Sequence, residues 1–214
     1  MLEDTHNDRV EVTIHDFKGY PLALQERLRG ANGCVWALGI SQTAVPREEY
    51  IHITKEIDLE AAQAFQHLRE GASDGFNFVY VSGEGATSTP GPCTPLFGRI
   101  KGETEARLID IQSQASNLRL LMVRPAHVDS KGHAAIAPYI PQPTVSLHAA
   151  NVVLGPVLRS FLTSYNSPTA PLGELLAGLA TGTWQDRLSG PGVENRGRTT
   201  IISNVGFRRL MGLS

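Results

Sequence analysis

The stretch FNFVYVSGEGATSTPGPCTPLFGRIK, Phe76–Lys101, decides the fold. It starts with an apolar run, Phe76–Ser82, passes through a Gly/Pro-rich loop, Gly83–Pro95, and then predicts a helix from Leu96. Strands of a parallel sheet are covered on both faces, so they read as short apolar runs rather than as an alternation. Ligands of such sheets bind beyond the carboxyl ends of the strands, which places Ser82 at the rim of a candidate site.

The helix after this loop carries Phe97 and Lys101 four residues apart. Residues four apart lie on the same face of a helix. We therefore expect Ser82, Phe97 and Lys101 to line one pocket.

The same strand-then-helix pattern continues on both sides of this stretch. The expected parallel strands are Val10–Ile14, Cys34–Leu38, Phe76–Ser82 and Leu118–Arg124, and the expected helices are Tyr20–Arg29, Pro46–Arg69 and the one from Leu96. Alternating strands and helices indicate an α/β protein, with a mostly parallel sheet flanked by helices.

The last part of the chain is less regular. It predicts a loop or lid at Pro125–Pro143, helices at Asn151–Leu162 and Leu172–Thr181, a strand at Thr199–Ser203, and a helix Val205–Met211 capped by Asn204. We expect one domain, 1–214, with the strand–helix repeat in 10–128 and the lid and C-terminal helices in 129–214.

Composition excludes several classes of protein. The net charge is −2 over 214 residues, so neither nucleic acid nor an anionic membrane is an expected partner. The two cysteines, Cys34 and Cys93, do not form a disulfide framework, and the polar N-terminus does not resemble a signal peptide. We therefore expect a cytoplasmic protein.

The spacing Ser82…Phe97-x-x-x-Lys101, followed by Gly-Glu-Thr-Glu, resembles the short-chain dehydrogenase/reductase superfamily. It looks most like the atypical branch of small NAD(P)-binding, epimerase-like reductases. The resemblance implies a Rossmann-like sheet, NAD or NADP as cofactor, and a small-molecule carbonyl or hydroxyl substrate. In that family a Tyr-x-x-x-Lys pair opens the helix: the Tyr is the proton donor or acceptor, and the Lys binds the nicotinamide ribose. Here Phe97 occupies the Tyr position.

Further site residues follow from the same resemblance. It implies Ser82 and Lys101 as the catalytic residues. It also implies that Ala37-Leu38-Gly39 packs on the adenosine and ribose, and that the segment Arg124-Pro125-Ala126-His127-Val128 passes the nicotinamide. The cofactor-binding set is then Ala37, Leu38, Gly39, Ser82, Lys101, Pro125 and His127. His127, His133 and His148 lack the tight spacing of a zinc site, so no metal is expected.

One feature of the family is missing. No G-x-G-x-x-G or similar glycine-rich turn precedes Val10, and Gly83-Glu84-Gly85 lacks the third glycine. In family terms the chain is N-terminally truncated, so we expect weak dinucleotide binding, because the pyrophosphate has no support. The truncation also predicts an uncovered sheet edge and a homodimer through it.

Other interpretations of these residues remain open. Phe97 suits the core of an amphipathic helix, and Ser82 suits a bond to the backbone at a strand end. Lys101 with Glu103 and Glu105 suits a solvated charged face. Alternatively, Tyr139 or Tyr80 replaces the missing phenol.

Three functions follow for the whole chain. The first is an NAD(P)-binding-type domain with weak or absent carbonyl reductase activity. The second is a non-catalytic interaction protein that retains the fold. The third is an active oxidoreductase completed by another residue or chain.

Overall fold

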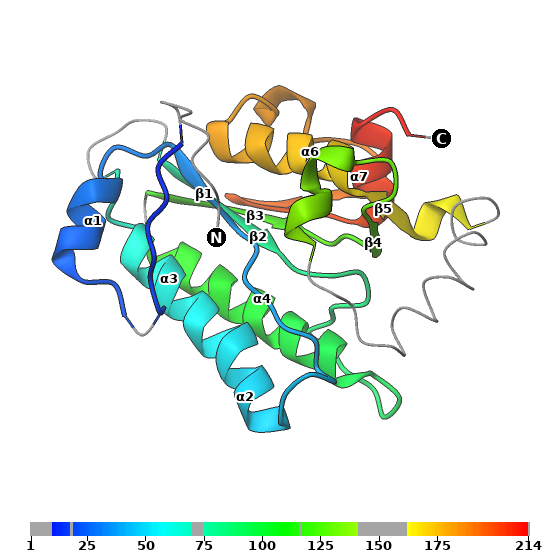
Figure 1. The fold of residues 1–214 in the computed structure, drawn as a ribbon, viewed down its shortest axis with the longest axis horizontal. Coiled ribbons are helices and arrows are strands. Elements are labelled where there is room, and N and C mark those ends of the chain that lie inside the picture. Colours follow the sequence, from blue (N-terminus) through cyan, green and yellow to red (C-terminus); the bar gives the residue numbers. More distant parts are fainter. Residues whose placement is uncertain (1–9, 18, 70–74, 116, 141–161, 214) are drawn as a thin grey trace.

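The computed structural model describes residues 10–17, 19–69, 75–115, 117–140 and 162–213. Its centre is a five-stranded sheet in the order β1-β2-β3-β7-β6 (Figure 1). The strands are β1 (Gly33–Trp36), β2 (Phe76–Val81), β3 (Leu118–Val123), β6 (Val193–Arg196) and β7 (Thr199–Ile202). All neighbours pair in parallel except β6, which is antiparallel to β7. The expected Rossmann-like, mostly parallel α/β fold is confirmed.

Helices cover both faces of the sheet (Figure 1). One face carries α2 (Arg47–Ile51), the π-helix η1 (His52–Glu56), α3 (Ile57–Phe65) and α4 (Leu96–Gln114). The other face carries α6 (Thr169–Thr181) and α7 (Asn204–Leu210), and α1 (Leu22–Leu28) lies at the β1 end of the sheet. A separate parallel pair joins β4 (His127–Asp129) to β5 (Asn166–Pro168), and the 3₁₀-helices are η2 (Ala134–Tyr139), η3 (Thr163–Tyr165) and η4 (Gln185–Arg187).

The apolar runs of the central strands are explained by the two helical layers. In β3, Leu120 and Met122 pack into the core beneath α3 and α4, whereas Leu121 and Val123 pack beneath α6 and α7. Both faces of the strand are thus buried, and the sequence shows a continuous apolar run rather than an alternation.

The predicted first strand is wrong. Residues 10–16 form no strand, and the side chains of Val10, Val12 and Ile14 are 65%, 62% and 98% exposed. An alternating pattern yields a strand only where a neighbouring strand completes its hydrogen bonds. Here the segment contacts the β1 end of the sheet through rings instead, with Phe17 edge-on to Trp36 at 5.8 Å between centroids.

Two of the predicted helices also differ in detail from expectation. The long helix predicted over Pro46–Arg69 is interrupted by the π-helix at His52–Glu56 and ends at Phe65. The N-cap of α7 is Ser203, not Asn204: the Ser203 hydroxyl accepts from the backbone N–H of Gly206 at 3.3 Å.

The region predicted as a loop or lid contains regular structure in its described part. Within Pro125–Pro143 lie the strand β4 and the 3₁₀-helix η2. The helix predicted at Asn151–Leu162 lies outside the described residues, apart from Leu162 itself, which is not helical.

Candidate functional site at the carboxyl end of β2

Ser82 and Lys101 lie together at the carboxyl end of β2. The ammonium nitrogen of Lys101 donates to the carbonyl oxygen of Val81 at 3.1 Å. Ser82 follows Val81 directly, and its backbone N–H donates to the carbonyl of Val123 in β3 at 2.8 Å. The Ser82 hydroxyl is buried and has no hydrogen-bond partner. The helix and the strand end therefore bring the Lys101 cation to the residue next to Ser82.

The lysine is in a poorly solvated place. Burial lowers the pKa of Lys101, and the negative charges of Asp58 and Glu105 oppose this shift. Its ammonium also lies 4.8 Å from the centroid of the Tyr80 ring, within the range of a cation–π contact.

The loop after β2 packs directly on α4, and two glycines permit this. A Cβ atom at Gly98 would lie 2.6 Å from the carbonyl oxygen of Gly85, and one at Gly102 would lie 1.9 Å from that of Thr87. Because both glycines are on the loop-facing side of α4, the backbone N–H of Thr87 reaches the carbonyl of Gly98 at 3.0 Å. The four-residue spacing of the two glycines is visible in the sequence.

Phe97 lies between this loop and the loop after β1. Its half-buried ring faces Gly85, where an added Cβ would be 3.6 Å from the ring's Cζ atom. Its backbone N–H, in the first turn of α4, donates to the side-chain oxygen of Gln42 at 3.0 Å. Gln42 thus connects the loop after β1 to the first turn of α4.

The predicted adenosine-contacting residues have mixed surroundings. Ala37 and Gly39 are exposed, whereas Leu38 is half-buried against the core on the α3 and α4 face. They lie in the loop that holds Gln42, on the same edge of the sheet as Ser82.

The loops after β2 and β3 are joined, as their topology predicts. The backbone N–H of Glu84 donates to the carbonyl oxygen of the buried residue Pro125 at 2.8 Å. An open pocket of about 540 Å³ lies beside this contact, lined by Glu84, Gly85, Ala126, His127, Leu162 and Tyr165. Of the predicted site residues, His127 lines this pocket, and Ser82 and Lys101 do not. Its lining is mainly apolar, and Leu162 and Tyr165 are residues that the sequence analysis missed.

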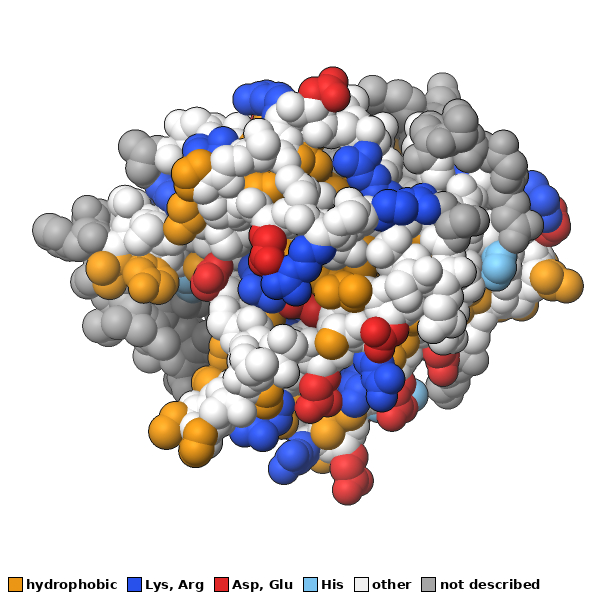
Figure 2. Space-filling model, turned by 180° about the vertical axis from the view of Figure 1, so that it is seen from behind, with side chains coloured by type: hydrophobic (Ala, Val, Ile, Leu, Met, Phe, Trp, Pro, Cys, Tyr) orange, Lys and Arg blue, Asp and Glu red, His pale blue; other side chains and the backbone are white. Residues whose placement is uncertain are grey.

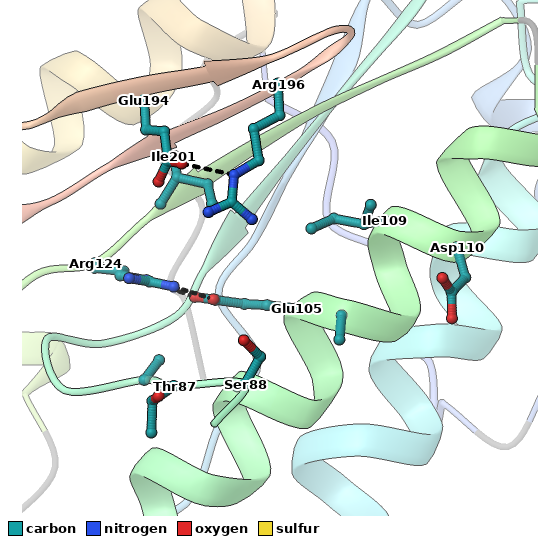
Figure 3. Close-up of a pocket in the computed structure, with 12 residues that line it drawn as sticks. Thr87, Ser88, Glu105, Ile109, Asp110, Arg124, Glu194, Arg196 and Ile201 are labelled. Atoms are coloured by element: carbon teal, nitrogen blue, oxygen red, sulfur yellow. Dashed lines mark hydrogen bonds and ion pairs between the residues drawn. The ribbon is translucent and has the colours of Figure 1, made fainter. Parts of the chain in front are cut away.

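A second pocket, of about 380 Å³, lies between α4 and the β6–β7 pair (Figure 3). Arg124 and Glu105 form a two-pronged ion pair in its wall, with 2.9 Å between Nε and Oε1. The predicted solvated face is wrong for Glu105, which is 4% exposed, because α4 turns this carboxylate toward the end of β3. The bond to Glu105 is the largest cause of the raised pKa of Arg124.

The two tyrosines considered as substitutes for the missing phenol lie in different places. Tyr139 is 63% exposed in η2, whereas Tyr80 is fully buried in β2 beneath Lys101. Burial and the nearby Asp58 raise the pKa of Tyr80 well above its usual value, so its hydroxyl remains protonated.

The described residues fit one end of a dinucleotide better than the other. Lys101 and the unpartnered Ser82 hydroxyl are suitable donors for ribose or carbonyl oxygens. By contrast, no glycine-rich turn at the start of a helix occurs among the described elements, so those elements offer no cradle for the pyrophosphate. Within the same part of the chain, no group of three or more His, Cys, Asp or Glu side chains is arranged to hold a metal.

On the face seen in Figure 2, acidic and basic side chains are interspersed rather than gathered by sign. None of the described helices combines the length and apolarity that a membrane span requires.

Fold and site together define a Rossmann-like α/β protein with a candidate ligand site at the carboxyl edge of its sheet. No protein-family model matches the sequence. Botcinic acid biosynthesis cluster B protein 16 of Botryotinia fuckeliana (strain B05.10) is 72% identical over 156 residues, which are 73% of this chain and 99% of that protein. Leucinostatins biosynthesis cluster protein T of Purpureocillium lilacinum is 30% identical over 220 residues, which cover 94% of this chain and 78% of that protein. The chain belongs to the family of biosynthesis-cluster proteins that these two relatives represent.

A solved structure is similar at greater distance. The angucycline C-6 ketoreductase LanV with bound NADP aligns with a TM-score of 0.48 and 19% identity, covering 88% of this chain and 67% of that one. This likeness is too distant to carry an activity or a cofactor across.

Proposed function

We propose that the chain is an NAD(P)-binding-type domain of the atypical short-chain dehydrogenase/reductase class, with weak or absent carbonyl reductase activity. The observation that carries the proposal is the meeting of Lys101 and Ser82 at the end of β2, where the ammonium is 3.1 Å from the carbonyl oxygen of Val81. The carboxyl end of a central parallel strand is where ligands of such sheets bind. The spacing of Ser82, Phe97 and Lys101, which resembles that superfamily, is the second support.

In this proposal the cofactor supplies the hydride, and the chain supplies binding and orientation. Lys101 binds the ribose of NAD or NADP, and the Ser82 hydroxyl donates to a carbonyl or hydroxyl oxygen. Phe97 presents a ring without a proton at the position of the family's phenol. A positioned general acid typically contributes about 10²–10⁴-fold to a rate, so turnover is slow.

The substrate is a small molecule with a carbonyl or hydroxyl group and a largely apolar body. The pocket of about 540 Å³ beside His127 has a volume within the range of small-molecule sites and a mainly apolar lining. The unpaired cysteines Cys34 and Cys93 favour a reducing compartment, so we place the protein in the cytoplasm.

The test is calorimetric titration with NADPH and NADH. We expect weak, saturable binding that is lost in Lys101→Met and retained in the control Lys55→Met, which breaks only the 3.0 Å ion pair between Lys55 and Glu103. A panel of carbonyl compounds is then assayed with the wild type and Phe97→Tyr, and we expect the variant to gain little while cofactor binding stays weak. The absence of binding at millimolar cofactor, or equal binding by Lys101→Met, contradicts the proposal.

A second candidate function is interaction through the β1 edge, which includes self-association as a homodimer. Among the described strands, β1 pairs only with β2, and the exposed side chains of Val10, Val12 and Ile14 lie in the unpaired segment before α1. Exposed apolar segments beside open sheet edges favour strand addition. Sedimentation velocity of the wild type and of Val35→Lys, which places a charge on β1, tests this candidate. A wild type that remains monomeric over a 100-fold range of protein concentration contradicts this candidate.

A further inference from the structure

The open pocket of about 540 Å³ between the loops after β2 and β3 has a mainly apolar lining, and Glu84 is the acid among its described lining residues. Glu84 comes two residues after Ser82, so the pocket begins just beyond the end of β2. The backbone N–H groups of Ser82 and Glu84 donate to neighbouring carbonyls, those of Val123 and Pro125, both at 2.8 Å. The two loops therefore stay side by side as they leave the sheet. In the proposed function this pocket holds the apolar body of the substrate, and Glu84 has no part.

One carboxylate oxygen of Glu84 is held by the first residue of α7. Its Oε2 atom accepts from the backbone N–H of Asn204 at 3.0 Å. An ionised carboxyl group has two oxygens with about four lone-pair sites, so this bond leaves acceptor capacity unused. Among the described residues no basic side chain forms an ion pair with Glu84, and the guanidinium of Arg124 is bonded to Glu105. Glu84 therefore offers an acceptor oxygen to a ligand in the pocket.

A buried asparagine connects the segments around this pocket. Asn204, which is 1% exposed, accepts at Oδ1 from the Ser167 hydroxyl at 2.6 Å, and its Nδ2 group donates to the carbonyl of Ser164 at 2.5 Å. The Ser167 hydroxyl also accepts from the backbone N–H of Ala126 at 2.9 Å. Asn204 thus joins α7 to β5, to η3 and, through Ser167, to the segment between β3 and β4, elements that lie together in Figure 1.

This hydrogen-bond network holds the acceptor of the pocket at a fixed place relative to its apolar walls. Ala126 forms part of one wall, and Leu162 and Tyr165, on either side of Ser164 in the sequence, form another. The side chains of Leu162 and Tyr165 are 46% and 58% exposed, and exposed apolar groups around a cavity favour an apolar ligand. An acceptor held in place beside such walls can select among apolar ligands, because binding requires little rearrangement.

We propose that Glu84 is a specificity-determining residue: the pocket takes a mainly apolar molecule that carries a hydrogen-bond donor, hydroxyl or ammonium, and disfavours acids. This inference rests on the proposed function, in which the pocket holds the substrate. A carboxylate accepts hydrogen bonds and cannot donate them, and bonds to it are stronger than bonds to a neutral acceptor. The donor of the ligand binds the carboxylate of Glu84 while Oε2 keeps the N–H of Asn204. An acidic ligand meets a like charge instead.

Four ligands with the same naphthyl body test the inference. They are naphthylmethanol, naphthylmethylamine, the methyl ether of the alcohol, which has no donor, and naphthoate. Their binding at pH 7.5 is followed by NMR of protein with ¹³C-labelled alanine methyl groups. The Ala126 signal, assigned with Ala126→Ser, reports on the pocket, and the Ala180 signal, from the core at α6, is the reference. The titrations compare the wild type, Glu84→Gln and Glu60→Gln, the last an equal change of charge at an exposed residue of α3.

We expect the wild type to bind the alcohol and the amine about threefold to tenfold more tightly than the ether, and naphthoate most weakly. The ratio stays below that of a fully desolvated charged hydrogen bond, because Glu84 is exposed. In Glu84→Gln the amide oxygen can keep the N–H of Asn204, which leaves the NH₂ group for the ligand. The alcohol and the amine then lose their advantage, and naphthoate gains affinity. Glu60→Gln should keep the wild-type order, and a merely structural Glu84 would change the affinity of all four ligands alike.

An ether that binds the wild type as tightly as the alcohol and the amine overturns the inference, as does an unchanged order of affinities in Glu84→Gln. Failure of all four ligands to shift the Ala126 signal at millimolar concentration also overturns it. If Glu84→Gln does not fold, the wild-type order alone decides. NADPH titration of the wild type separates this failure from that of the proposed function. A wild type that binds no NADPH contradicts the function, whereas NADPH binding with no preference for donors contradicts the role of Glu84 and leaves the function standing.

Discussion

The stability of the protein should fall as the pH rises through the titration of Asp58. The pKa of this carboxyl is raised from 3.8 to about 6 in the folded chain, mainly by burial. A raised pKa means that the folded state binds the proton more tightly than the unfolded state does. The stabilising contribution is therefore fully present below about pH 4 and is lost as the pH rises to about 6 and above.

The size of the effect follows from the shift. A difference of about two pKa units corresponds to roughly 3 kcal/mol in the free energy of unfolding, at about 1.4 kcal/mol per unit. Asp58→Asn removes this titration, and its amide oxygen can still accept from the indole N–H of Trp36. Between pH 4 and pH 7 the stability of the variant relative to the wild type should thus rise by most of that amount.

Urea unfolding at several pH values, followed by tryptophan fluorescence and circular dichroism, measures this difference. Other carboxyl groups contribute to both proteins and cancel in the comparison. Glu60→Gln is the control and should parallel the wild type. A difference between Asp58→Asn and the wild type that stays constant from pH 4 to pH 7, or that changes in the opposite direction, refutes the reasoning.

Three more predictions concern an ion pair, a close helix–loop contact and a helix N-cap. Arg124→Met should destabilise the protein by about 3–5 kcal/mol, because it leaves the carboxylate of Glu105 buried without its partner; urea unfolding measures this, and a smaller loss in the double variant with Glu105→Gln is the check. Gly102→Ala should destabilise the protein in thermal unfolding, because its Cβ would overlap the carbonyl of the loop after β2; Gly173→Ala, which meets nothing within 4 Å in α6, should be neutral or stabilising by up to about 1 kcal/mol. Ser203→Ala removes the N-cap of α7 and should cost about 1 kcal/mol in the same measurement; no loss at all would show that the cap contributes nothing.

The sequence predicted the central strands well because burial on both faces leaves a strong signal. The run FNFVYV in β2 and the run LRLLMV in β3 could be assigned from composition alone, since each strand serves two cores. The segment Val10–Ile14 had an equally regular pattern, but an alternation does not say whether a neighbouring strand is available. Strand pairing depends on the tertiary structure, and none of the described strands pairs with Val10–Ile14.

The candidate site was only partly predictable for a related reason. Family resemblance indicated Ser82 and Lys101, and topology indicated that the loops after β2 and β3 would meet. Neither could show that Glu105 turns inward to Arg124, since a carboxylate two residues from another usually marks a solvated face. The burial of Asp58 could not be predicted either, because its place opposite β1 depends on a π turn that no local sequence pattern indicates.

Two acids, Asp58 and Glu105, affect the charge of Lys101 in α4. Asp58 and Glu105 come from different helices, and both act to keep Lys101 charged in a place where burial alone would favour loss of its proton. Arg124 pairs with Glu105 from the end of β3, whereas Oδ1 of Asp58 accepts from the indole N–H of Trp36. Asp58, whose pKa burial raises to about 6, is an acid whose protonation changes within an accessible pH range. The charge of Lys101 thus depends in part on two acids that come from different helices.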